Sequence, residues 1–160
     1  MLIKNIIDED FVNYKKPLMF IGFNSCTFKC DKECGKPVCQ NSELAKAPSI
    51  EIDPSEIVER YMSNPITEAV VCGGLEPFDT FEDLIGLVSL FRNYTQDDIV
   101  IYTGYYPNEI MPQLQELSKY SNIIIKFGRF RPNKPHRFDK ILGIELSSNN
   151  QYAKRLEDCL

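Results

Sequence analysis

The chain has 160 residues and a net charge of −5 at pH 7, from 18 basic and 23 acidic side chains. This acidic balance argues against a protein that binds nucleic acid over a broad surface. No apolar run approaches the roughly 18 residues that a membrane helix needs, and no early segment joins a basic start to an apolar core. We therefore expect one domain over residues 1–160 that works in the cytoplasm, with neither a membrane nor a nucleic acid as partner.

Apolar runs of strand length recur along the chain after residue 16. Turn-forming or charged residues bound them, which is typical of strands in compact domains. Strands are expected at residues 17–24 (PLMFIGFN), 68–74 (EAVVCGG), 98–104 (DIVIYTG) and 122–128 (NIIIKFG), with a fifth candidate at 140–146 (KILGIEL).

Helix signals fill the intervals between these strands. Asp53 is followed directly by Pro54, a pair that favours a helix start, and Thr80 precedes a segment with apolar residues on one helical face. Helices are expected at residues 53–64, from 80 onward, at 107–120 and at 151–159. Strands that alternate with crossover helices predict an α/β fold with a small, mainly parallel sheet.

Three loops stand out because each follows one of the first three strands. They are the cysteine loop (residues 26–41), GGLEPF (73–78) and TGYY (103–106). The carboxyl ends of parallel strands lie at one rim of a sheet, and functional loops gather there. We therefore expect the cysteines, a glycine-lined backbone and an aromatic loop to surround one cavity.

The cysteine loop, CTFKCDKECGKPVCQN, holds four of the six cysteines: Cys26, Cys30, Cys34 and Cys39. A reducing cytosol disfavours disulfides, so such a group more often holds metal or carries redox chemistry. Thiolates select zinc or iron–sulfur clusters. A closed zinc site would use all four, whereas a cluster held by three would leave one iron open. The loop contains no Cys-x-x-Cys pair, which favours the cluster but leaves the spare cysteine undecided.

The same segment resembles the Cys-x-x-x-Cys-x-x-Cys motif of radical S-adenosylmethionine (radical SAM) enzymes. CTFKC matches the first two cysteines, and Cys39-Gln40-Asn41 is similar to the ending in the activator branch of that superfamily, where the third cysteine is followed by any residue and then Asn. The resemblance implies that Cys26, Cys30 and Cys39 hold a [4Fe–4S] cluster. Cys34 then lies in an insertion that widens the usual two-residue gap to eight, so Cys34 stays open as an alternative third ligand.

Further segments support the resemblance. GGLEP is similar to the Gly-Gly-Glu-Pro motif of the superfamily, with Leu75 in place of its second glycine. YTGY resembles the Trp-Thr-Gly-Tyr segment of anaerobic ribonucleotide reductase-activating proteins, and LGIELSSNNQ loosely resembles their Gly-Ser-Ser-Asn-Gln stretch. The resemblance implies that the cofactor S-adenosylmethionine is bound by Asn41, Gly73, Gly74, Glu76, Thr103 and Tyr105.

The resemblance also implies a fold and an activity. The fold would be an open partial (β/α) barrel of the radical SAM type. The activity would be reductive cleavage of S-adenosylmethionine to a 5′-deoxyadenosyl radical, which then generates a glycyl radical on a partner enzyme, the anaerobic ribonucleotide reductase. A donor of low-potential electrons would be a second partner.

Two other functions stay open. One is a small radical SAM enzyme that modifies a peptide or a small metabolite. The other is a non-enzymatic module that binds zinc through four cysteines and recruits a partner. A basic segment at residues 126–137 would either dock an acidic partner surface or form a solvated charged loop.

Overall fold

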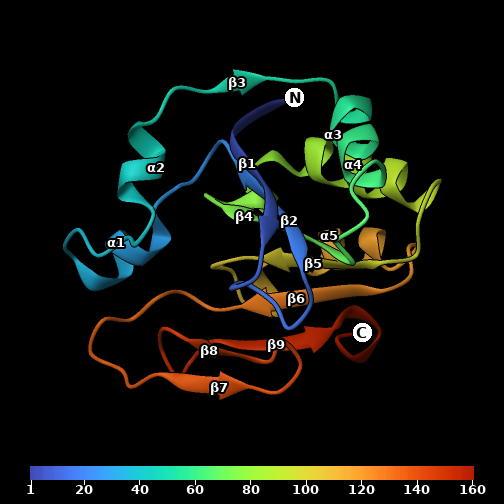
Figure 1. Ribbon diagram of the computed structural model, residues 1–160. Coiled ribbons are helices and arrows are strands. Elements are labelled where there is room, and N and C mark those ends of the chain that lie inside the picture. The colour runs from blue at the N-terminus through green and yellow to red at the C-terminus, as the bar shows by residue number, and fades with distance from the viewer.

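The computed structural model describes residues 1–160 and places most strands in one seven-stranded sheet (Figure 1). In pairing order the strands are β3 (Ile50–Glu51), β1 (Leu2–Asp10), β2 (Leu18–Phe23), β4 (Ala69–Gly74), β5 (Asp98–Tyr102), β6 (Ile123–Phe127) and β9 (Tyr152–Arg155). The four central strands β2, β4, β5 and β6 are parallel, and β1 and β9 pair with them antiparallel. The predicted α/β fold with a largely parallel sheet is therefore confirmed.

One face of this sheet is covered by crossover helices. They are α3 (Pro54–Met62), α4 (Phe81–Arg92) and α5 (Met111–Leu117). Alternate strand residues such as Met19, Val70 and Ile99 point into the large hydrophobic core beneath them. Each fully buried aliphatic or aromatic side chain there contributes about 1.5–3 kcal/mol, so this face anchors the fold. No helix has both the length and the apolar character needed to cross a membrane.

The opposite face is covered over only part of its area. Strands β7 (Arg137–Asp139) and β8 (Ile144–Leu146) form a separate two-stranded ribbon, drawn in orange and red near the bottom of Figure 1. With this ribbon, Tyr14, Leu142 and Leu146 pack on the amino-terminal halves of the parallel strands in a small second core. The carboxyl-terminal halves of those strands are left to line a cavity.

The last segment of the chain corrects a prediction. Residues 151–159 were expected to form a helix, but they form β9 and a 3₁₀ turn (Leu156–Asp158). Burial along Tyr152–Arg155 alternates, with Ala153 in the small core, and β9 pairs with the free edge of β6. The backbone hydrogen bonds that β6 offers at its edge override the weak local preference for helix.

Three smaller expectations also change. In the 140–146 segment only β8 is a strand, and it pairs with β7 outside the main sheet. The 107–120 segment divides at Ile110 into a 3₁₀ turn (Pro107–Glu109) and α5. Helix α4 does begin after Thr80, but the Thr80 side chain makes no capping hydrogen bond because a 3₁₀ turn (Pro77–Thr80) leads into the helix. By contrast, Asp53 begins α3 as predicted, since its carboxylate accepts the Ser55 backbone N–H at 2.9 Å.

Candidate functional site

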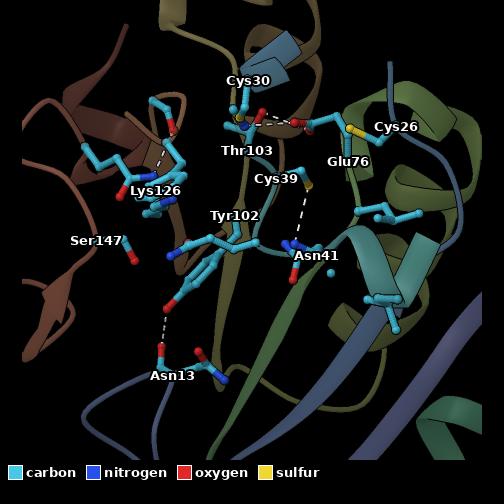
Figure 2. Close-up of a pocket in the computed structure, with 18 of the residues that line it drawn as sticks. Asn13, Cys26, Cys30, Cys39, Asn41, Glu76, Tyr102, Thr103, Lys126 and Ser147 are labelled. Atoms are coloured by element: carbon cyan, nitrogen blue, oxygen red, sulfur yellow. Dashed lines mark hydrogen bonds between the residues drawn. The ribbon is translucent and has the colours of Figure 1, made fainter. Parts of the chain in front are cut away.

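A cavity of about 530 Å³ lies at the carboxyl ends of the parallel strands, on the face that the crossover helices leave free. The cysteine loop forms one wall of it with Cys26, Cys30 and Cys39, whereas Cys34 does not line it (Figure 2). Other predicted site residues in the wall are Asn41, Gly74, Glu76, Thr103 and Tyr105. Gly73 does not line the cavity; it lies beneath the wall on β4, where a Cβ atom would come within 3.2 Å of the Phe20 ring. The three loops thus meet at one rim, as the sheet topology predicted.

The three lining cysteines share a second feature, because each thiol faces a backbone N–H. The pairs are Phe28 with Cys26 (N···Sγ 3.2 Å), Asn41 with Cys39 (3.4 Å) and Phe130 with Cys30. Cys34 has no such donor. Backbone donors stabilise thiolates and help to set the potentials of iron–sulfur clusters, so the surroundings of these three sulfurs suit cluster ligands.

Burial controls the protonation of two of these thiols. It raises the pKa of Cys26 to about 12 and raises that of Cys30 above its ordinary value, while the backbone donors act in the opposite sense. Both groups therefore stay thiols near neutral pH until iron displaces their protons. The thiols stand along the wall and do not converge, with other metal-binding side chains, on a single point. The donor set, three thiols around a roomy cavity, fits a cluster of several irons.

Asp31 explains how the long gap between Cys30 and Cys39 closes. It lies in the short helix α1 (Lys29–Cys34), and its Oδ1 accepts the backbone N–H groups of Val38 at 2.7 Å and Cys39 at 2.8 Å. These two bonds bring Cys39 back beside the first turn of α1. The residues between, including Cys34, are left outside the cavity wall.

Glu76 ties the end of β4 to both neighbouring loops. Its side chain is 7% exposed and accepts hydrogen bonds from Thr103 Oγ1 at 2.9 Å, the Gly104 N–H at 2.8 Å and the Phe78 N–H at 3.1 Å. Its own N–H donates to the Ser25 carbonyl at 2.7 Å, next to the first cysteine. Burial raises the pKa of Glu76 to about 7, against the effect of these three donors. Glu76 therefore braces the cavity wall.

Gly74 ends β4 in a conformation that suits glycine alone. Its φ is +79°, and a Cβ atom would lie 2.8 Å from the Gly22 Cα. A larger residue would push β2 and β4 apart at the cavity rim.

Tyr105 and Asp79 link the aromatic loop to the cysteine loop. The Tyr105 hydroxyl donates to Asp79 Oδ1 at 2.6 Å, while Asp79 Oδ2 accepts the Thr27 N–H at 2.9 Å. The Lys29 ammonium lies 4.2 Å from the centre of the Tyr105 ring. The sequence resemblance assigned Tyr105 to the cofactor site but missed Asp79, whose only signal was its place directly after GGLEPF.

An ionic clasp, which we define as Glu33, Glu109, Arg129 and Arg131, holds α1 against the segment that follows β6. Arg131 Nη2 lies 2.7 Å from Glu33 Oε1, Arg129 Nε lies 3.5 Å from Glu33 Oε2, and Arg129 also pairs with Glu109. The basic segment at 126–137 is therefore largely occupied within the protein, since Arg137 also pairs with the buried Asp139. These contacts indicate that the arginines of this segment hold the cysteine loop in place.

We expect Glu33→Gln to loosen the cysteine loop without unfolding the protein. Glu33 and Arg131 are about one-third exposed, so the pair contributes about 1 kcal/mol or less to stability. Iron should be lost to a chelator roughly fivefold faster than from the unchanged protein, and high salt should accelerate loss from the unchanged protein in the same way. Lys134→Gln, at an exposed position without an ion pair, is the control. Equal rates for the two variants would contradict the clasp.

The floor of the cavity contains two residues that sequence reasoning did not assign to the site. Tyr102 ends β5, and its hydroxyl donates to the Asn13 carbonyl at the far end of the cavity from the cysteines (Figure 2). Lys126 pairs with Tyr102 across β5 and β6 and lies 5.4 Å from the centre of its ring. Burial lowers the pKa of Lys126 to about 8, against the nearby Cys30 and Glu76. Only the alternation of β6 could have shown that Lys126 shares a face with the cavity.

The fold and the site together define an α/β protein with three thiols around a cavity at the rim of a parallel sheet, a donor set suited to an iron–sulfur cluster. The chain matches the model of a family described as "4Fe-4S single cluster domain" over residues 17–153. It belongs to this family, and the prediction of a [4Fe–4S] cluster is supported in preference to zinc. Searches among curated proteins and among solved structures found no match.

Proposed function

We propose that the protein is a radical SAM oxidoreductase that generates a glycyl radical on a partner enzyme. The observation that carries this proposal is the meeting of Cys26, Cys30 and Cys39 with Gly74, the last residue of β4, in one cavity. The sequence resemblance names the same three cysteines and the same strand end. Membership of a [4Fe–4S] family supports the first half of the proposal, the cluster itself.

Each of the chain's own site residues has a distinct role in this proposal. Cys26, Cys30 and Cys39 would hold the cluster through their thiolates, and the cavity beside them would take S-adenosylmethionine. When bound, the cluster would supply the electron that cleaves the sulfonium C–S bond of S-adenosylmethionine to methionine and a 5′-deoxyadenosyl radical. Gly74 would let the end of the β4 backbone approach the cofactor, Gly73 would leave room for the Phe20 ring beneath it, and Asn41, Thr103 and Tyr105 border the same space.

The remaining parts of the proposal concern the fold, the partner and the compartment. Parallel strands covered on one face and open on the other support an open partial (β/α) barrel. The partner is a glycyl-radical enzyme of the anaerobic ribonucleotide reductase kind, with a donor of low-potential electrons. The free cysteines suit a reducing cytoplasm. We further propose that residues 1–160 act as one domain.

The test is to mix the reduced protein, S-adenosylmethionine and the reductase without air. We expect a glycine-radical doublet by electron paramagnetic resonance (EPR), with release of methionine and 5′-deoxyadenosine. Cys26→Ala, which removes a ligand, should give neither signal nor cleavage.

Cofactor cleavage without a glycine radical would favour the second candidate, a small radical SAM enzyme acting on a peptide or metabolite. The specific observation in favour of that candidate is the cavity's extension past Tyr102 to Asn13, which leaves room beside the cysteines. Loss of cleavage as well, in protein with a full cluster, would overturn both.

A further inference from the structure

Lys126 is the one charged side chain of the cavity wall that has no polar partner. Among the others, Lys29 lies 3.9 Å from a Glu109 oxygen and Glu145 lies 2.6 Å from His136 Nδ1. Glu76 accepts its three hydrogen bonds. The Lys126 ammonium makes no hydrogen bond or ion pair, and it lies 5.4 Å from the centre of the Tyr102 ring. An unpaired cation among aromatic and aliphatic groups is costly, so its retention indicates that a negative charge occupies the cavity.

The position of Lys126 points to the source of that charge. It lies on β6, and four residues further on the Phe130 N–H faces the Cys30 thiol. The same strand and loop thus bring two groups towards one cysteine, a backbone donor and an ammonium. Both residues line the cavity, with Cys30 beside Thr103 and Lys126 nearer Tyr102 in Figure 2, and the charges of the Cys30 and Lys126 side chains act on each other. Glu76, the other acidic group that acts on Lys126, is already occupied by its three donors.

We propose that Lys126 is the counter-charge of the cluster held by Cys26, Cys30 and Cys39 and raises its reduction potential. A [4Fe–4S] cluster with three thiolates carries net negative charge, and reduction adds one electron without a proton. A fixed ammonium nearby therefore stabilises the reduced form more than the oxidised form. Lys126 acts on the cluster through space and touches no reacting atom, so it is a positioning residue.

The inference rests on the cluster ligands named in the proposed function but not on the radical reaction. It is tested by the midpoint potential, measured without S-adenosylmethionine by EPR-monitored titration of the anaerobically purified protein with dithionite. We expect Lys126→Met to make reduction roughly tenfold less favourable, a fall of about 59 mV in the one-electron potential. Lys126→Arg keeps the charge and should keep a potential close to that of the unchanged protein.

Lys134→Met is the matched control, because it removes the same charge from an exposed position. Iron near four per chain in each variant shows that the ligands are intact. An unchanged potential in Lys126→Met with a full cluster would overturn the inference, whatever the outcome of the glycine-radical assay. If Lys126→Met loses its cluster, Lys126→Gln carries the same expectation. Loss in both neutral variants but not in Lys126→Arg would support the counter-charge, and loss in all three would assign Lys126 to packing alone.

Discussion

Replacing Cys26, Cys30 or Cys39 with alanine is expected to abolish cluster binding. Each sulfur lines the cavity and faces a backbone N–H, and the cavity wall contains no other cysteine that could replace a lost ligand. After anaerobic reconstitution, the unchanged protein should contain iron and sulfide near four each per chain. Each alanine variant should fall close to zero in both assays and lose its brown colour.

Cys34→Ala is the internal control for this prediction. Cys34 lies in the same loop but outside the cavity wall, so iron and sulfide should stay near those of the unchanged protein. A cluster that survives Cys39→Ala and disappears in Cys34→Ala would show that the third ligand is assigned wrongly. About one bound zinc in a colourless protein would instead favour the alternative hypothesis, a zinc-binding module with four cysteine ligands.

Replacing Glu76 with alanine is expected to destabilise the protein by about 3 kcal/mol or more. The change leaves two backbone donors and the Thr103 hydroxyl unpaired inside the protein, and each buried unpaired group costs roughly 1–3 kcal/mol. The midpoint of anaerobic denaturant unfolding should fall accordingly. Glu82→Ala, at an exposed position six residues further on, should change stability by less than about 0.5 kcal/mol.

The stability of the protein should depend on pH through Glu76, and the pKa of Glu76 gives the direction of this dependence. The pKa of Glu76 is about 7 in the folded protein, above the ordinary value of 4.5, because the carboxyl group is buried. Between these values the folded state keeps a proton that the unfolded chain releases, so the stabilisation that comes from this retained proton is complete below pH 4.5 and is lost as the pH rises to about 7. The stability difference between the unchanged protein and Glu76→Gln should therefore shrink over that range and stay level above it. A difference that grows with pH would contradict this account.

Much of the architecture was predictable because its signals are local. Apolar runs such as 98–104 and start signals such as Asp53 lie within a few residues of the elements they form. The helix prediction for residues 151–159 was wrong because these residues by themselves tolerate a helix. They form a strand by pairing with β6, which lies more than 20 residues earlier in the chain. The same distinction between local and long-range signals applies to the site. The cysteines and strand ends were visible in sequence, whereas Asp79 and Lys126 joined the site only through the register of distant strands and loops.

By itself, the sequence determined that this chain alternates strands with helices and offers thiols to an iron–sulfur cluster, because periodicity and ligand chemistry depend on neighbouring residues. Only the tertiary structure decided which thiols face the cavity. Two hydrogen bonds to Asp31 bring Cys39 back beside α1 and leave Cys34 outside. Only the tertiary structure, too, turned Arg129 and Arg131 towards Glu33 and left the Lys126 charge unpaired within the wall. The reason is physical: burial and pairing of charges depend on groups that are far apart in the chain and meet only when the sheet has formed.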